Sequence, residues 1–303
     1  MIVSFHPTGD GLGRILSRLA PQVDAVVVAD NSPKHDDSAF AIIRQYAPAS
    51  TRISLLRFGE NLGIAAALNE GVTAAIREGA DFVITSDQDS LPAEGMLQAL
   101  HECHTGLVEA GYRVGAVGPT YADEYTGYTY PFQVNRPDKL FYGHATPDSS
   151  TPVVETLAII TSGSFFAANT FKRVGTFRED FFIDHVDTEW CHRLRAHGYS
   201  IFGCAAATMQ QRLGEEQLRV WFFGWRKESA YGPQRIYYRV RNYVALLPLQ
   251  HMEWHWKLRS GWYMLGIVYA NLVFNRKATR REFAWAALRG LWHGMTGRLG
   301  RDH

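Results

Sequence analysis

The feature that most constrains the fold is the alternation of two kinds of segment over the first 120 residues. Apolar, β-rich runs predict strands at residues 2–5, 25–30, 53–58, 82–87 and 114–119. Apolar residues at helical spacing predict helices between them, at 11–20, 40–47, 61–80 and 96–111. Strand–helix alternation with short connections indicates an α/β protein with an open, mostly parallel sheet and helices on both faces.

Polar, turn-forming residues follow the first four predicted strands. They are His6-Pro7, Asp30-Asn31-Ser32, Gly59-Glu60-Asn61 and Asp87-Gln88-Asp89. Ligands of open α/β sheets bind beyond the carboxyl ends of the strands. The sequence therefore predicts a ligand site along this edge of the sheet.

The aspartates after the fourth strand, Asp87 and Asp89, give the most specific prediction at this edge. Two carboxylates on one turn can approach Mg²⁺, which typically takes one or two carboxylates and completes its shell with phosphate oxygens and water. The alternative is an Asp or Ser that caps a helix beginning at Pro92. The residues alone leave both interpretations open.

Two other stretches at this edge give weaker signals. Asp30 and Asn31 can accept hydrogen bonds from a base or a ribose, although an Asx turn explains them without a ligand. Asn61 and Gly63 precede a predicted helix, whose N-terminus favours phosphate and whose glycine lets a ligand approach the backbone. The same N-x-G pattern is also common as a helix cap.

The stretch DHVDTEW, residues 184–190, places acids at the start of a predicted helix. A carboxylate there, such as Asp187, can act as a general base that takes the proton from an attacking hydroxyl group. The alternative is that the helix macrodipole favours acids in the first turn. Glu189 and Arg193 are spaced i,i+4, which predicts an ion pair on the surface.

The cysteine and histidine patterns do not indicate a metal site. Three cysteines without a C-x-x-C pair fit a reducing compartment and argue against structural zinc. His251 and His255 do not form an H-E-x-x-H pattern, and HECH at 101–104 lacks zinc-ligand spacing. No Walker loop, nucleophile elbow or dinucleotide fingerprint is present.

Residues 251–303 differ from the rest in charge and aromatic content. They carry nine Lys and Arg against three acids, a net charge of +6, whereas the remainder has a net charge of −5. They also hold five of the eight tryptophans. Tryptophan and basic residues favour the lipid–water boundary. The alternative is a helical hairpin packed on the preceding domain or on a second subunit.

Two further expectations concern the middle and the ends of the chain. Residues 120–160 are aromatic and turn-rich, which predicts irregular or antiparallel β-structure over one edge of the sheet. The uncharged run 260–275 is shorter than the roughly 20 residues of a membrane span. Because the first residues already resemble a strand, we expect no signal peptide and a cytoplasmic protein.

Eight segments, in order, resemble one family over nearly the whole chain: IVSFHP, VVVADNS, ENLGIAAALNEG, ITSDQDS, ITSGSFF, FFIDHVDTEWCHRLRAHGY, LGE (213–215) and IYYRVRNYVAL. The chain is similar to the inverting glycosyltransferases of family 2, which have the GT-A fold. The segments DQDS, VDTEW and YYRVRN are most similar to the rhamnosyltransferase branch, whose members build O-antigen and other cell-surface polysaccharides.

The resemblance implies a role for each matching residue. Asp187 would be the general base, and Asp89 would bind Mg²⁺ or Mn²⁺ on the diphosphate. The implied nucleotide-sugar-binding residues are Phe5, His6, Asp30, Asn31, Asn61, Gly63, Asp87 and Gln88. The residues that would contact the acceptor or the donor sugar are Gly163, Asp184, Glu189, Trp190 and Arg241.

The implied reaction is a single in-line displacement that inverts the anomeric configuration. The implied donor is dTDP-L-rhamnose, and the acceptor is a glycan or a polyprenyl-diphosphate-linked saccharide. The alternatives are another UDP- or dTDP-sugar donor, a catalytically inactive nucleotide-sugar-binding protein, or a nucleotidyltransferase. The acids at 87, 89 and 187 argue against the inactive protein, and HPTGDGLGR is a poor match to a nucleotidyltransferase loop.

The chain departs from the family pattern at two points. Relatives often carry a histidine where this chain has Gln211, so the resemblance does not imply a histidine metal ligand. Relatives also have residues ahead of the first strand, which leaves open a start upstream of Met1 or a short first strand. We expect a catalytic domain at 1–250 and a C-terminal helical extension at 251–303 that associates with the cytoplasmic face of the inner membrane or forms a homodimer.

Overall fold

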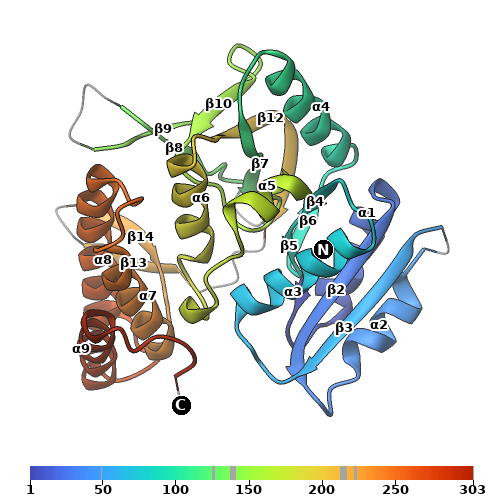
Figure 1. Cartoon of the computed structure of the whole chain (residues 1–303). Helices are drawn as coiled ribbons and strands as arrows, with labels where there is room; N and C mark the ends of the chain where they lie inside the picture. Colours follow the sequence, from blue (N-terminus) through green and yellow to red (C-terminus); the bar gives the residue numbers. More distant parts are fainter. Residues whose placement is uncertain (49, 125–126, 137–140, 212–216, 222–223, 303) are drawn as a thin grey trace.

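The computed structural model describes residues 1–302 except 49, 125–126, 137–140, 212–216 and 222–223, and two adjoining sheets form its centre (Figure 1). The first sheet is parallel, in the order β3-β2-β1-β5. Its strands are β1 (Ile2–Ser4), β2 (Ala25–Pro33), β3 (Arg52–Gly59) and β5 (Ser86–Asp87). The predicted α/β class is confirmed.

The second sheet is mixed and has the order β10-β12-β7-β11-β4, with β6 paired to β12. Its strands are β4 (Phe82–Ile84), β6 (Ser90–Pro92), β7 (Val114–Asp123), β10 (Val153–Thr156), β11 (Phe165–Ala167) and β12 (Ser200–Gln211). Residues 82–87, predicted as one strand, join the two sheets. Thr85 N donates to Ser164 O at 3.0 Å, and one residue later Ser86 N donates to Met1 O at 3.0 Å.

Helices cover both faces of these sheets because the strands are apolar on both sides. In β2, Val26 and Val28 face one core and Val27 and Ala29 face the other. The first core includes α1 (Arg14–Leu19), α2 (Ser38–Tyr46) and α4 (Met96–Glu109). The second core includes α3 (Ile64–Arg77), α5 (Ala168–Val174) and α6 (Val186–Ala196).

Three short helical turns complete the first two hundred residues. A π-helical turn at η1 (Gly9–Gly13) precedes α1, so the predicted helix at 11–20 does not begin as an α-helix. The turn η2 (Ala20–Gln22) follows α1, and η3 (Glu179–Phe181) precedes the loop to α6.

The segment after the acidic turn is a strand and not a helix start. Pro92 lies in β6 and pairs with Met209 of β12, and α4 begins only at Met96, after Gly95. The alternative interpretation of Asp87 and Asp89 as part of a cap ahead of Pro92 is therefore wrong. The two aspartates connect strands of the two sheets.

A helical layer and two small hairpins form the side of the molecule at left in Figure 1. The layer contains α7 (Pro233–Leu246), α8 (Trp254–Phe274) and α9 (Arg280–Thr296). Ile236, Val240, Met264, Ile267 and Phe283 form its core. The hairpins are β8 (Phe132–Val134) with β9 (Gly143–Ala145), and β13 (Gln217–Trp221) with β14 (Trp225–Ser229).

The predicted C-terminal helical extension is present, and it packs on α7, which precedes residue 250. The division of the chain at residue 250 stays a prediction. Across the described part of the chain, none of the helices has both the length and the apolar composition needed to span a membrane.

Gly63 joins the first sheet to the loop ahead of α6. Its φ is +88°, and a Cβ there would lie 2.6 Å from Phe182 Cδ2 and 2.7 Å from Phe182 O. The next residue, Ile64, donates its N–H to Phe182 O at 2.7 Å. This position therefore needs glycine both for its backbone conformation and for the close approach of Phe182.

We expect Gly63→Ala to lower the free energy of unfolding by about 2 kcal/mol more than Gly79→Ala, because it adds a steric clash to the same backbone strain. Gly79 is the matched control, since its φ is +95° and a Cβ there would meet nothing within 4 Å. Urea unfolding of both variants measures the difference. Equal losses would contradict the close contact between Gly63 and Phe182.

Candidate active site

The acidic turn lies at the carboxyl end of β5. Asp87 is partly buried and Asp89 is exposed. Burial raises the pKa of Asp87 to about 7, with further contributions from the negative charges of Asp89 and Asp187, while Arg235 acts in the opposite direction. Three acids from two separate segments therefore share one electrostatic environment.

Serine hydroxyls fix the backbone of this turn. Asp87 N donates to Ser162 Oγ at 3.1 Å, and Ser162 Oγ donates to Ser90 Oγ at 2.6 Å. On the other side of the turn, Gln88 exchanges two hydrogen bonds with the backbone of Phe5, both at 3.0 Å. The side chain of Gln88 thus joins the turn to the end of β1.

Asp187 lies in the first turn of α6 and lines a cavity of about 120 Å³ together with Ser162. Burial raises the pKa of Asp187, and the charge of Asp184 raises it further, while hydrogen bonds from the N–H and hydroxyl of Thr188 lower it. Ser162, which also accepts a hydrogen bond from Asp87 N, therefore connects the acidic turn to the cavity that Asp187 lines.

The loop ahead of Asp187 is strained. Phe182, Asp184 and His185 have φ values of 63°, 64° and 63°, a region that residues other than glycine rarely adopt. The Asn242 Nδ2 lies 2.9 Å from Phe181 O, 2.7 Å from Ile183 O and 3.1 Å from Asp184 O. The side chain of Asn242 therefore holds the loop in this conformation.

Arg241 supports the same loop from within the protein. Its side chain is 1% exposed, and its guanidinium donates to Phe181 O at 2.9 Å and Gly300 O at 2.5 Å. The resemblance implied a contact of Arg241 with a sugar. The structure instead places its donors on backbone carbonyls, because the loop and the C-terminal residues leave them inaccessible.

Sequence reasoning missed Arg235 and Arg239, which lie on α7 and bind Asp184. Arg239 Nη1 lies 3.0 Å and Arg235 Nε 3.3 Å from the Asp184 carboxylate. Burial raises the pKa of Asp184, but the two arginines and His185 outweigh it and the pKa is lowered. The basic residues in QRIYYRVRN were the available signal, although their partner could not be found without the fold.

The structure brings together the residues predicted at the ends of β1 and β2, but those at the end of β2 are buried and those at the end of β1 are exposed. Asp30 and Asn31 are buried. Asp30 Oδ1 accepts from Ser32 N at 3.2 Å and Ser32 Oγ at 2.7 Å, the geometry of the Asx-turn alternative. Asn31 donates to Asn61 Oδ1 at 3.0 Å and accepts from the N–H of Leu62 at 2.8 Å. These contacts fix the backbone where β2 ends and α3 begins.

Phe5 and His6, in contrast, are exposed at this edge of the sheet. Their rings pack edge to face at 4.3 Å, and His6 Nδ1 lies 2.8 Å from the Asp36 carboxylate. They therefore present an aromatic surface beside the acidic turn, since Gln88 binds the backbone of Phe5.

Three residues that the resemblance assigned to the sugar lie elsewhere. Glu189 is 1% exposed and binds Arg193 at 3.0 and 2.9 Å, so the predicted ion pair forms in the interior and not on the surface. Trp190 is 1% exposed in the aromatic core and donates to Gly175 O. Gly163 packs against Pro119, where a Cβ would lie 2.6 Å from Pro119 Cγ. All three support the site from behind.

Comparison with known proteins places this site in a family. The model of glycosyl transferase family 2 matches residues 1–157, just over half of the 303-residue chain. The chain belongs to glycosyl transferase family 2. The matched residues contain the acidic turn and the polar ends of the first three strands, whereas Asp187 lies beyond them.

This glycosyltransferase resembles a curated relative along its full length. It is 26% identical over 300 residues to the dTDP-rhamnosyl transferase RfbF of Shigella flexneri, an alignment that covers 99% of this chain and 96% of the relative. Among solved structures, it is similar to GalNAc-T7 crystallised with UDP, GalNAc and Mn²⁺. The TM-score is 0.58 at 11% identity, over 97% of this chain and 55% of GalNAc-T7, which confirms the GT-A fold.

The acidic turn of this glycosyltransferase fits a partial metal shell. Asp87 and Asp89 offer hard oxygen ligands, and the negative charge of Asp89 adds to the effect of burial in raising the pKa of Asp87. Within the described ranges, no three His, Cys, Asp or Glu side chains are grouped to hold an ion by themselves. The remaining ligands would come from diphosphate and water. The family segment LGE at 213–215 lies outside the described residues.

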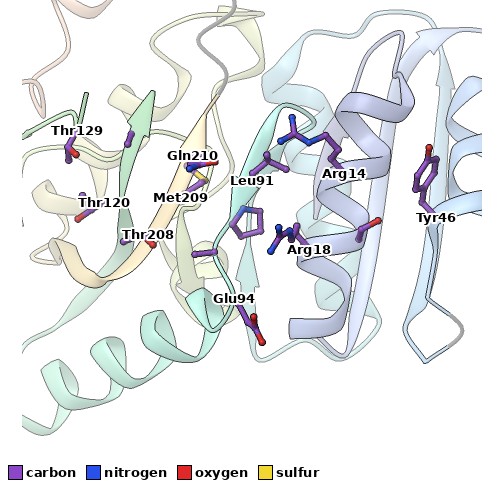
Figure 2. Close-up of a pocket in the computed structure, with 14 residues that line it drawn as sticks. Arg14, Arg18, Tyr46, Leu91, Glu94, Thr120, Thr129, Thr208, Met209 and Gln210 are labelled. Carbon is purple, nitrogen blue, oxygen red and sulfur yellow. The ribbon is translucent and has the colours of Figure 1, made fainter. Parts of the chain in front are cut away.

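A separate cavity of about 590 Å³ lies between α1 and the ends of β6 and β12 (Figure 2). Arg14 and Arg18 project from α1 toward it, and Arg14 is paired with Glu124 at 2.8 Å. It contains none of the acids described above, so it lies apart from the candidate active site.

We expect Asp87→Asn to stabilise the protein in the absence of donor and metal. The folded state holds the proton of Asp87 up to about pH 7, whereas an unfolded aspartate ionises near 3.8, so ionisation costs stability as pH rises between these values. The unfolding midpoint should rise by at least about 2 °C at pH 8, corresponding to roughly 1 kcal/mol or more, and by a smaller amount at pH 5. Differential scanning calorimetry measures both.

The control is Asp81→Asn, which changes an exposed aspartate in the turn before β4. It should leave the midpoint unchanged at both values of pH. A lower midpoint for Asp87→Asn at pH 8 would show that Asp87 stabilises the fold and does not carry a repulsive charge.

Proposed function

We propose that this glycosyltransferase moves L-rhamnose from dTDP-L-rhamnose to a hydroxyl group of a saccharide acceptor, in the synthesis of a cell-surface polysaccharide of the O-antigen type. One observation carries the proposal: Asp187 at the start of α6 and the Asp87–Asp89 turn at the end of β5 form one acidic site. The similarity to RfbF over both chains supports the choice of donor.

The donor would bind along the carboxyl ends of β1, β2 and β5. The exposed Phe5 and His6 rings offer a surface for the base, and the hydrogen bond between Asn31 and Asn61 fixes the neighbouring strand end. Asp89, with Asp87, would hold Mg²⁺ or Mn²⁺. When bound, such an ion neutralises the charge that develops on the departing diphosphate.

Asp187 is the candidate general base because it is the acid whose carboxylate lines the cavity beside the turn. It would accept the proton of the acceptor hydroxyl as that oxygen bonds to the anomeric carbon and the bond to the diphosphate breaks. The displacement is in line, so the anomeric configuration inverts. Its raised pKa makes the carboxylate a stronger base than an ordinary aspartate.

Asp184, in contrast, is a positioning residue. Its carboxylate is occupied by Arg235 and Arg239, and its pKa is lowered, which makes it a weak base. The 42% exposed side chain of Arg235 also acts electrostatically on Asp87, so it lies where it could compensate charge on a donor phosphate.

We expect Asp187→Asn to lower kcat about 10²–10⁴-fold with little change in donor affinity, because it removes proton transfer and keeps the shape of the side chain. Asp89→Ala should instead weaken metal-dependent donor binding. A panel of dTDP- and UDP-sugars, assayed for transfer and for hydrolysis with Mg²⁺ or Mn²⁺, measures both and identifies the donor.

Below the raised pKa of Asp187 the wild-type rate should fall as the base becomes protonated. Circular dichroism of each variant controls for folding. Equal turnover by wild type, Asp89→Ala and Asp187→Asn would reject the mechanism, and preference for another nucleotide sugar would reject rhamnose.

The outer faces of α8 and α9 suggest where the protein encounters a membrane-bound acceptor. The α8 stripe consists of Trp254, Leu258, Trp262 and Leu265, all more than half exposed at helical spacing. The α9 stripe consists of Trp285, Leu288, Trp292 and Met295, which are 58–66% exposed. Exposed apolar stripes of this size mark interaction surfaces.

Charge favours an anionic lipid surface as the partner of these stripes. The turn between α8 and α9 carries the exposed basic residues Arg276 and Lys277, and the first turn of α9 carries Arg280 and Arg281. Basic residues beside a tryptophan-rich amphipathic helix favour anionic headgroups. We therefore include peripheral contact with the cytoplasmic face of the inner membrane in the proposal, which would bring the site to a lipid-linked acceptor.

We expect the double variant Trp285→Ser, Trp292→Ser to lose at least about tenfold in affinity for vesicles that contain phosphatidylglycerol, because it removes two exposed indoles. Vesicle sedimentation measures this. Phe40→Ser on α2 is the matched control, since Phe40 is 51% exposed but lies outside both stripes.

The membrane assignment would be contradicted if wild-type protein does not bind vesicles but forms a dimer that the double variant does not form. In that case the stripes would be a subunit interface. Analytical ultracentrifugation of both proteins distinguishes the two outcomes.

A further inference from the structure

A second cavity, of about 850 Å³, lies between α8 and the tyrosine-rich segment that includes β8 and β9. Aromatic side chains dominate its walls: Tyr121, Tyr130, Tyr142, Tyr263 and Tyr269, together with Trp262, which also belongs to the α8 stripe. Tyr121 and Tyr130 stack at 5.2 Å. Arg259 of α8 lies over the Tyr142 ring at 5.9 Å and links the two walls.

This aromatic cavity adjoins the small cavity that contains Asp187. Tyr121, Pro131 and Gln133 line both cavities. Burial raises the pKa of Tyr121, and Tyr130, Asp187 and Tyr263 raise it further, so its hydroxyl is electrostatically close to Asp187 as well as to the α8 wall. A molecule in the aromatic cavity would therefore extend toward the proposed base.

Gln133 has an unused acceptor at this junction. Its Oε1 is buried and has no hydrogen-bond partner among the described residues. A buried amide oxygen without a partner costs free energy that a bound hydroxyl group would restore. The atom is thus placed to accept a hydrogen bond from a polyhydroxylated ligand.

The charges in the cavity favour a neutral ligand. Arg259 and Glu228 are opposite in sign, and burial, together with Arg259, lowers the pKa of His144. Aromatic walls with a few placed polar groups suit ligands that have both apolar faces and hydroxyls. A saccharide ring has this combination, whereas a nucleotide would bring uncompensated negative charge.

We propose that the aromatic cavity is the acceptor site, and that it binds a saccharide whose hydroxyl groups reach Gln133 Oε1 while the sugar rings contact Tyr263 and its neighbours. This inference rests on the proposed function for the reaction at Asp187, but it assigns residues to the acceptor that the donor site does not use. In this proposal α8 also contributes to acceptor binding, because its residues Tyr263 and Tyr269 line the cavity.

The test uses full-length protein and a panel of nitrophenyl pyranosides as acceptor probes. With saturating dTDP-L-rhamnose and Mg²⁺ or Mn²⁺, we expect Tyr263→Ala and Gln133→Ala to lower kcat/KM for transfer about tenfold, mainly through KM. Donor hydrolysis, in which water replaces the acceptor, should change less than about twofold because it does not need the cavity. Tyr112→Ala is the control, since Tyr112 is 48% exposed and packs on Phe202, outside the cavity.

Saturation-transfer NMR with the same probes separates the two proposals. If the probes contact wild type but not Tyr263→Ala, the acceptor site is supported even where no donor is turned over. If no donor is turned over at all, only the proposed function is rejected. Unchanged transfer in both cavity variants, or no contact of any probe with wild type, would overturn the acceptor site.

Discussion

The contact of Asn242 with the loop ahead of α6 is the constraint on which the site depends. One side-chain amide lies within hydrogen-bond distance of three backbone carbonyls in a loop whose φ values are otherwise unfavourable. This loop fixes where α6 begins, and hence where Asp187 lies. It also contacts Gly63, so the same loop joins the start of α3, beside the first sheet, to the start of α6, which carries Asp187.

The site concentrates negative charge that the fold alone does not balance. Asp87, Asp89 and Asp187 repel one another, while Arg235 and Arg239 are mostly engaged by Asp184. At the proposed site, a cation and a donor diphosphate together would compensate this charge and so stabilise the protein. Such destabilisation at functional sites is common in enzymes.

The strands, the helices and the edge that carries the site could be predicted from the sequence because period and polarity are local properties. Asp87, Asp89 and Asp187 lie together as expected from their positions at strand and helix ends. Burial could not be predicted in the same way. Glu189 and Trp190 share a helix with Asp187, but the helix face that carries them points into the core.

The same limit explains the errors on α7 and β6. The resemblance assigned Arg241 to a sugar, but its side chain is buried, because the loop and the C-terminal residues offer it carbonyls from distant positions. Pro92 resembles a helix start, but β12 supplies a strand partner from more than a hundred residues away. Long-range pairing overrides local preference in both places.

Close packing between α7 and α9 has a mechanical consequence. Cβ atoms at Gly290 and Gly294 would lie 2.6 Å from the carbonyls of Tyr237 and Arg241, so the two helix backbones touch without intervening side chains. The helix that holds the loop before Asp187 is thus joined rigidly to the helix with the outermost tryptophans. If those tryptophans bind the protein to a bilayer, about two helix diameters would set the distance between the lipid headgroups and the proposed base, Asp187. The enzyme would then select acceptors by how far their sugar extends from the lipid.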